Sequence, residues 1–215
     1  MKLTKKKILV AALAVGLIAT VSLGSIAWFS DTDKVENKFY IASSDDDNPD
    51  DIFSVDVWEN TPDGDSDPDG YEYSDVQPGD QLKKEANVQN TGHYDQYVRV
   101  KITVTDAAAW MAVLGKNADT IRMADIFDGY EGGKWEHGSC EVTSDDKLVF
   151  TIYLTDILTE GNSVEVFKKV KIPTDMTADQ AAAFDNEFGV DVVADAVQTK
   201  NVGNSCYEAF RTVGI

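Results

Sequence analysis

The alternation of hydrophobic and polar residues predicts that strands dominate this chain. The clearest example is YVRVKITVT at residues 97–105, where valine or isoleucine occupies every second position. Successive side chains of a strand point to opposite faces, so this segment would have one apolar face and one mostly polar face. We therefore predict a half-buried strand here.

The same period of two recurs in other segments, which are separated by turn residues. QPGD at residues 77–80 and NTG at residues 90–92 combine glycine with proline or asparagine, which is typical of tight turns. Further strands are predicted at residues 35–41, 52–60, 82–90, 147–154, 163–173 and 190–202.

Other segments have a helical composition instead. Thr177 followed by Gln180 matches a capping box, in which two side chains satisfy main-chain groups at a helix start. Asp106 and Gly115 enclose an alanine-rich run as its candidate start and stop. Helices are predicted at residues 106–115, 119–127 and 177–188, and a loop or hairpin tip at residues 129–138.

Strands outnumber helices and lack the regular strand–helix alternation of a parallel α/β sheet. We therefore predict a mainly β fold, an antiparallel jelly-roll-like β-sandwich with short inserted helices, formed by residues 45–215. An acidic loop is expected at residues 60–75, inside a stretch of the chain that contains no lysine or arginine between residues 45 and 80.

The first residues predict a secretory signal peptide at residues 1–27. Four lysines precede a long apolar run, and Ser25-Ile26-Ala27 fits the small-residue rule for signal peptidase. Cleavage after Ala27 would leave Trp28 as the first residue of a secreted protein. The uncharged run from residue 8 to 29 is also long enough to span a hydrocarbon core of ~30 Å, so an uncleaved membrane anchor is the alternative.

The charge of the chain restricts its partners. The formal net charge is −19, and removal of residues 1–27 takes away four lysines and no acid, which makes it −23. A surface this acidic repels nucleic acid and attracts cations. We expect no nucleic-acid partner.

Motifs for catalysis are missing from the sequence. His93 and His137 are the only histidines and lie far apart in the chain, and no HExxH, GxSxG or phosphate-binding glycine loop occurs. Many carboxylates are present, but in so acidic a chain a close pair is expected by chance. We predict no catalytic residues, no cofactor site and no enzyme.

One acidic segment is a candidate calcium loop. Asp65, Asp67 and Asp69, followed by Gly70, match the start of a DxDxDG loop, in which alternate carboxylates converge on the ion. The twelfth position is Val76 instead of the usual glutamate. A solvated acidic loop without calcium is the alternative.

Cys140 and Cys206 are the only cysteines. In an exported protein they could form one disulfide, which would stabilise the fold by roughly 4 kcal/mol in the chain-entropy model. Two separate buried thiols are the alternative.

The predicted strand at residues 35–41 has an apolar face made of Val35, Phe39 and Ile41. Such a terminal strand can pair within its own sheet. It can also add to the sheet edge of a neighbouring molecule, and that contact propagates head to tail into a filament. The residues by themselves leave both outcomes open.

Several motifs in order resemble the TasA/camelysin family of Gram-positive biofilm-matrix proteins. They are the export signal near WFSDTD, the NKF segment, the QPGD turn, NTG followed by YVRVKI, and the closing VDVVADAVQTKNV. The resemblance covers most of the chain, from Lys5 to about Val202. It is weakest in the acidic stretch at residues 45–75 and in the final NSCYEAFRTVGI.

The resemblance implies a jelly-roll subunit of extracellular fibres. Residues 28–44 would be a donor strand that fills a groove of the next subunit, with Val35, Phe39 and Ile41 pointing inward. Its implied partners are further copies of this chain, a SipW-type signal peptidase that frees the donor strand, and other matrix proteins. Two alternatives accompany this hypothesis: a cell-surface metalloprotease of camelysin type, and a membrane-anchored monomeric module that binds another surface component.

Overall fold

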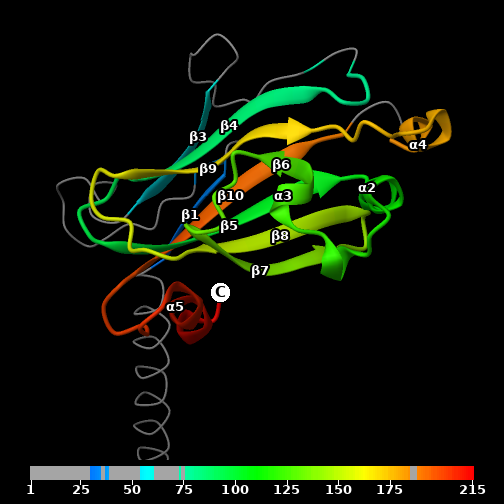
Figure 1. The fold of residues 1–215 in the computed structure, drawn as a ribbon. Coiled ribbons are helices and arrows are strands. Elements are labelled where there is room, and N and C mark those ends of the chain that lie inside the picture. Colours follow the sequence, from blue (N-terminus) through cyan, green and yellow to red (C-terminus); the bar gives the residue numbers. More distant parts are fainter. Residues whose placement is uncertain (1–29, 35–36, 39–53, 61–72, 74–75, 185–187) are drawn as a thin grey trace, which may run out of the picture.

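The computed structural model describes residues 30–34, 37–38, 54–60, 73, 76–184 and 188–215. In this part of the chain two antiparallel sheets pack face to face, with short helices at their ends (Figure 1). The predicted antiparallel β-sandwich with short inserted helices is therefore confirmed. The finer jelly-roll assignment remains a prediction.

The larger sheet has its strands in the order β2–β1–β10–β5–β8–β7, and the smaller sheet has the order β3–β4–β9–β6. The strands of the larger sheet are β1 (Ser30–Lys34), β2 (Asn37–Lys38), β5 (Gln96–Thr105), β7 (Trp135–Val142), β8 (Lys147–Leu154) and β10 (Val190–Gln198). Those of the smaller sheet are β3 (Val55–Asn60), β4 (Gln81–Asn90), β6 (Phe127–Asp128) and β9 (Ser163–Lys171).

The core lies between the two sheets and is built by the alternation seen in the sequence. In β5 the inward residues Val98, Val100, Ile102 and Val104 are fully buried. Burial of each such side chain contributes roughly 1.5–3 kcal/mol relative to exposure. Strand β8 follows the same pattern, so these two strands form where they were predicted.

Strand β7 was not predicted, because its sequence WEHGSCEV lacks a regular apolar period. A β-bulge at Gly138 shifts the register between His137 and Ser139, so the inward positions change parity along the strand. Trp135 and Cys140 are its buried apolar residues. The predicted loop or hairpin tip at residues 129–138 therefore ends at Lys134, and β7 begins at the next residue, Trp135.

Trp135 also closes the side of the sandwich. Strand β6 pairs with only the end of β9, at Lys169 and Val170. Farther along β9, the indole Nε1 of Trp135 donates a hydrogen bond to the main-chain oxygen of Glu165 at 2.9 Å. A side chain from the larger sheet thus satisfies part of the open edge of the smaller sheet, where an unpaired edge invites unwanted pairing.

The predicted turns at residues 77–80 and 90–92 form through side-chain contacts. Asp80 N–H donates to the oxygen of Gln77 at 3.1 Å, and Gln77 N–H donates to the Asp80 carboxylate at 2.8 Å. Asn90 is fully buried, and its amide nitrogen donates to the main-chain oxygens of Tyr94 and Leu158. Each turn is therefore closed by a polar side chain whose partners lie on the main chain.

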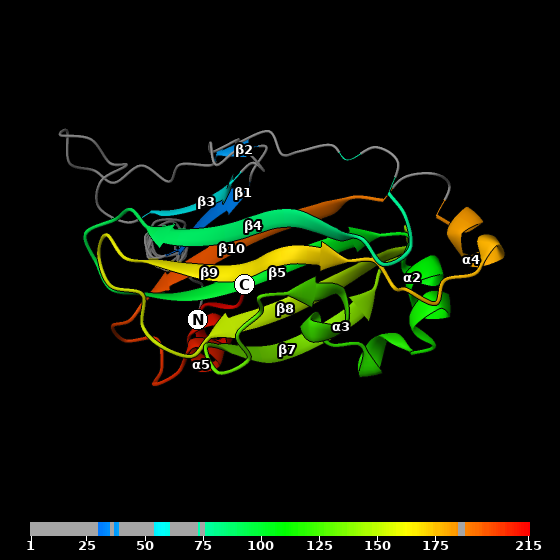
Figure 2. The same ribbon diagram turned by 45° about the horizontal axis from the view of Figure 1, so that its top comes forward.

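Helices α2 and α4 lie at one end of the sandwich, whereas α5 lies on the outer side of the larger sheet near the other end (Figure 2). Thr177 and Gln180 form the predicted capping box at α4, whereas Asp106 precedes α2 without any side-chain cap bond. The helices and the 3₁₀ turn are α2 (Ala107–Leu114), η2 (Ala118–Thr120), α3 (Met123–Ile126), α4 (Ala178–Ala182) and α5 (Cys206–Val213).

Helix α5 was not predicted, although its sequence carries a signal for it. Cys206, Ala209, Phe210 and Val213 follow the helical spacing of one apolar stripe. Ser205 caps the helix, since its hydroxyl accepts a hydrogen bond from the N–H of Glu208 at 3.3 Å.

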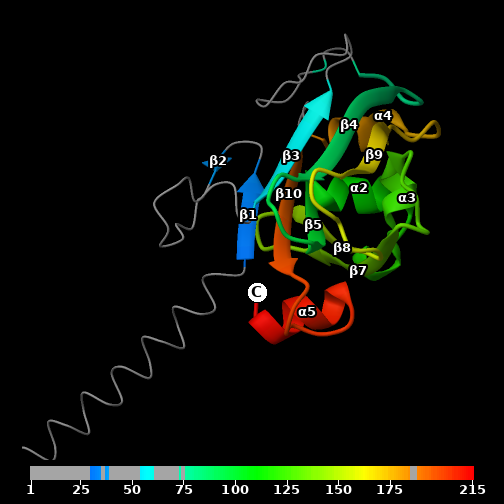
Figure 3. The ribbon, with the colours of Figure 1, turned by 90° about the vertical axis from the view of Figure 1, so that its left-hand side faces the viewer.

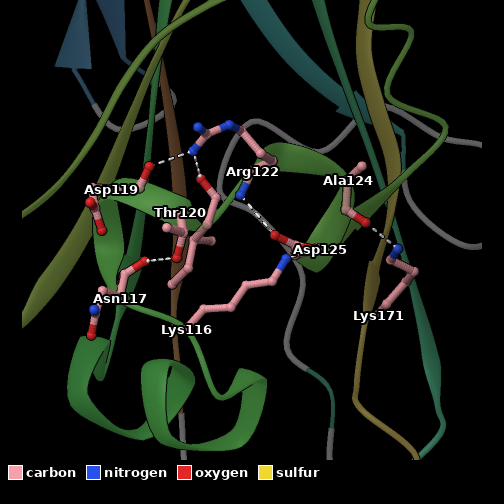
Figure 4. Close-up of polar contacts among 9 residues, drawn as sticks. Lys116, Asn117, Asp119, Thr120, Arg122, Ala124, Asp125 and Lys171 are labelled. Atoms are coloured by element: carbon pink, nitrogen blue, oxygen red, sulfur yellow. Dashed lines mark hydrogen bonds and ion pairs between the residues drawn. The ribbon is translucent and has the colours of Figure 1, made fainter.

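A polar network holds the segment between α2 and β6 (Figure 4). The Lys116 ammonium contacts one oxygen of Asp125 at 2.6 Å, and the main-chain N–H of Arg122 donates to the other oxygen at 2.8 Å. The Arg122 guanidinium donates to the main-chain oxygen of Asp119 at 2.7 Å, and Lys171 of β9 donates to that of Ala124. The network joins η2 to α3, and Lys171 holds α3 on the smaller sheet, whereas η2 contacts β7 of the larger sheet.

Asp125 is the centre of this network, and its environment alters its acidity. Burial by itself raises the pKa of the Asp125 carboxyl, but the hydrogen bonds from Lys116 and Arg122 and the charges of Lys116 and Lys171 outweigh burial and hold the pKa below 3.8. Because the folded pKa is lowered, the ionised carboxylate stabilises the fold above a pH of about 4, and this contribution is lost as the pH falls through the folded value.

We expect Lys116→Met to raise the pKa of Asp125, because burial would then be opposed by fewer contacts. Titration of the Asp125 carboxyl by NMR measures the shift directly. Lys134→Met is the control. It removes the same charge from a different ion pair, in which Lys134 lies 2.9 Å from Glu131. An unchanged Asp125 pKa in Lys116→Met, or an equal rise in the control, would contradict the assigned role of Lys116.

We expect Gly138→Ala to lower the free energy of unfolding by about 1–3 kcal/mol, the usual range for forced overpacking. A Cβ at Gly138 would meet the Tyr153 ring at 2.5 Å and the main-chain oxygen of Thr151 at 2.9 Å. Urea unfolding measures the change. Gly133→Ala is the matched control, because a Cβ at Gly133 has no atom within 4 Å. Equal stability of the two variants would contradict the close packing at the bulge.

Candidate assembly edge

The N-terminal part of the described chain forms an edge strand of the larger sheet. Strand β1 pairs antiparallel with β10, in a register that joins Ser30 to Val197 and Lys34 to Val193. On its other side, within the described part of the chain, β1 pairs with the two-residue β2. Strand β1 also contacts β3, so the edge strands of both sheets lie side by side here (Figure 3).

Strand β10 has small residues on its inner face. Ala194 and Ala196 are fully buried between the sheets, and Val192 is nearly so. The register places Asp33 opposite Ala194 and Asp31 opposite Ala196. The two positions of β1 opposite these alanines are thus acidic in sequence.

The pairing of β1 within its own sheet is one of the two outcomes that the sequence left open. It concerns residues 30–34, whereas the predicted strand began at Val35. The polymerisation residues Val35, Phe39 and Ile41 lie outside the described residues. Whether the apolar face of this segment enters a neighbouring molecule therefore stays a prediction.

Two further sets of predicted site residues lie outside the description. They are the cleavage residues Ala27 and Trp28 and the calcium candidates Asp65, Asp67 and Asp69. Among the described residues there is no group of three or more histidine, cysteine or acidic side chains that could hold a metal ion. None of the helices in that same part of the chain has the length and apolar character that crossing a bilayer demands.

The two histidines occupy different environments. His93 is exposed, and its Nδ1 lies 2.7 Å from a carboxylate oxygen of Glu160. His137 is a residue of β7 rather than of a loop, and its buried Nδ1 has no hydrogen-bond partner. Burial, and then the charge of Arg122, lower the pKa of His137, so it stays neutral at physiological pH.

Cys140 and Cys206 are both free and buried in the structure, so of the two alternatives the structure has the separate thiols. Cys140 faces the core between the sheets, opposite Phe150. Cys206 lies in a second apolar cluster beneath α5, where its thiol donates to the main-chain oxygen of Val98 at 3.1 Å. No disulfide joins them, because the larger sheet lies between the two clusters.

Burial also makes both thiols unreactive. It raises the pKa of the Cys140 thiol to about 11 and that of the Cys206 thiol to about 12. The thiolate is the reactive form, so both cysteines are protected in the folded protein.

A buried ion pair near this edge was not predicted. Arg99 of β5 and Asp195 of β10 are register partners, with 6% and 4% of their surface exposed. Nε of Arg99 donates to the Asp195 carboxylate at 2.9 Å, and the Lys101 ammonium lies 3.2 Å from the same oxygen. On its other side, the position of Asp195 is paired with Thr32 of β1. The ion pair therefore lies one strand away from the edge strand.

Comparison with family models, curated proteins and solved structures finds no match to this chain. The family resemblance thus rests on the motifs quoted above, and what it implies about function is a proposal.

We expect the variant Lys34→Cys with Val193→Cys to form an intramolecular disulfide in the freshly purified monomer. Paired strand positions have Cα atoms about 4.5–5.5 Å apart, within the range that a disulfide spans. The control joins Lys34→Cys to Val197→Cys, four residues along β10 and therefore about 13 Å out of register. Non-reducing electrophoresis and peptide mapping identify the bond. Equal cross-linking of both variants would contradict the register.

Proposed function

We propose that this chain is a secreted structural protein that assembles head to tail into extracellular matrix fibres, through its N-terminal segment. The observation that supports this most directly is the position of β1, a short terminal strand held at the sheet edge by its ladder with β10. Departure of such a strand leaves the pairing among β3 to β10 intact. The same main-chain groups can then pair with a strand from another copy.

The inward residues of β10 would suit a more apolar partner strand than β1. Ala194 and Ala196 are small and face the core, so larger apolar side chains on the paired strand would add to the apolar area beside them. A donor shifted by eight residues from the register of β1 would place Phe39 and Ile41 where Asp31 and Asp33 stand. The shift is an even number, so the face of each side chain is kept.

Exchange of this kind replaces acidic positions with apolar ones. Burial of a phenylalanine and an isoleucine contributes roughly 1.5–3 kcal/mol for each side chain, while the main-chain hydrogen bonds are equal in number before and after exchange. Assembly would thus gain apolar burial at this edge. The contact joins different surfaces of two copies, so it continues into a fibre rather than closing as a dimer.

The remaining parts of the proposal follow from the sequence. Signal cleavage after Ala27 by a SipW-type peptidase would free the donor segment, and the high negative charge would keep separate fibres apart. Other matrix proteins are further proposed partners, and a calcium ion at Asp65, Asp67 and Asp69 is a proposed ligand. The crossing of the chain between the sheets, from β4 to β5 and from β8 to β9, supports the jelly-roll form of the subunit.

The proposal is tested with two purified chains, one beginning at Trp28 and one beginning at Ser44. We expect filaments from the longer chain only, because the shorter chain lacks the donor segment. Size-exclusion chromatography and negative-stain electron microscopy measure the outcome. Filaments from both chains would place the assembly contact elsewhere, and monomers from both would favour the anchored surface-binding module.

The side chains of the donor are tested in the longer chain. Phe39→Ser with Ile41→Ser should abolish filaments, whereas Tyr40→Ser, on the opposite face, should leave them intact. The pair Lys34→Cys with Val193→Cys should lose its cross-link in assembled material, because a donor shifted by eight residues no longer places position 34 opposite Val193. Filament formation by the double variant would contradict the proposed burial of Phe39 and Ile41 against β10.

A further inference from the structure

Helix α5 forms a small folded unit of its own on the larger sheet. It packs on the face turned away from the smaller sheet, at the end where β5 begins and β10 ends (Figures 1 and 3). Its buried residues Cys206, Ala209 and Phe210 join Tyr97 and Val197 of the sheet in one apolar cluster. This cluster is separate from the main core, so the two are divided by the sheet itself.

Besides the hydrogen bond from the Cys206 thiol to Val98, Arg99 links α5 to the sheet through several contacts. The Arg99 guanidinium stands over the Phe210 ring, with its central carbon 4.4 Å from the ring centroid. One terminal nitrogen, Nη1, donates to the main-chain oxygen of Ile215 at 2.7 Å, while Nε donates to Asp195. A single buried cation thus contacts the helix, the residues that follow it, and β10.

The loop before α5 fixes how the helix meets the sheet. Gly203 has a φ of +132°, and a Cβ there would meet the Cβ of Glu208 at 2.8 Å. Glycine is the residue that adopts this conformation without strain and also permits the close approach. The loop therefore turns the chain back onto the outer face of the larger sheet, where α5 contacts β5 and β8 and covers Val197 of β10.

We propose that α5 is a clasp: a unit that is held shut by Arg99, keeps β10 in the sheet from its outer face, and opens before the sandwich unfolds. The clasp cluster is small and one-sided, whereas the main core is enclosed by two sheets. Elements with few buried apolar contacts open at lower free energy than the core does. When the clasp opens, β10 loses its outer cover, and Arg99 loses its partners on α5.

The clasp acts on the strand that pairs with β1. While it is shut, the Arg99–Asp195 pair is shielded from water and ties β10 to β5, so β10 keeps its place when its other neighbour leaves. That consequence for assembly rests on the proposed function. The opening of the clasp does not, and the experiment below uses the unassembled protein, so the two can fail independently.

The two natural cysteines report on the two units. Cys206 lies under the clasp and Cys140 lies in the main core, with 5% and 8% of their surface exposed. If exposure in the folded structure set the rate, Cys140 would react faster with a maleimide than Cys206. If α5 opens locally, Cys206 reacts faster instead. We expect Cys206 to be labelled at least about tenfold faster than Cys140 under native conditions. Cys206 becomes accessible when α5 opens locally, whereas Cys140 becomes accessible only when the whole sandwich unfolds. Peptide mass spectrometry assigns the labelled residue.

Arg99→Gln should speed the labelling of Cys206 by about tenfold to a hundredfold, the usual effect of losing hydrogen bonds to a charged group. It should speed the labelling of Cys140 by a smaller factor, because the loss of Arg99 also leaves the buried Asp195 carboxylate with fewer partners and destabilises the sandwich. Arg211→Gln is the matched control, because Arg211 is an exposed arginine on the same helix. Phe210→Leu keeps the apolar packing but removes the ring beneath the guanidinium, and we expect the same direction of change with a smaller size.

Hydrogen exchange tests the hold on β10 in the same variants. The amides of residues 193–198 should lose protection together with those of α5, while the amides of β4 keep theirs. Equal labelling rates of the two cysteines, or equal acceleration of both by Arg99→Gln, would overturn the clasp as a separate unit. Loss of protection in α5 alone would overturn its hold on β10.

Discussion

The pairing of β5 with β10 is the interaction on which the rest of the molecule depends. Its register brings the valines of β5 and the alanines of β10 onto one face, where they form the core. The same register places Arg99 against Asp195 on the other face. A buried ion pair adds little net stability, but a buried charge without its partner is costly. A slip of β10 by one residue would turn Asp195 toward the core and leave Arg99 without its partner, so the pair favours this register.

Strand β10 therefore has four distinct boundaries. On one side it is bound to β5 by a ladder with nine register pairs, and on the other it meets the five pairs of β1. Its outer face is covered by α5 near Val197, and its inner face presents small alanines to the core. The proposed strand exchange and the proposed clasp concern different boundaries of this one strand. That separation allows one side to change its partner while the others hold.

Much of the sandwich could be predicted from local pattern alone. Strands β5 and β8 have an apolar residue at every second position, and this period by itself determines which face is buried. The capping box at Thr177 needs only the residues of one turn, and it forms as predicted. Strand β7 was missed because the bulge at Gly138 changes the parity of its inward residues, and a bulge depends on the partner strand.

The sequence by itself determined the alternating faces of the main strands, the class of the fold and the acidity of the surface, because each depends on residues close together in the chain or on composition. Tertiary structure alone decided the contacts between distant segments. Arg99 and Asp195 are 96 positions apart, and nothing local marks them as partners. It likewise decided that α5 covers β10, that Cys140 and Cys206 lie on opposite faces of one sheet, and that β1 pairs in its own sheet. In every case the local sequence is compatible with several partners, and the choice depends on which surfaces the complete fold brings together.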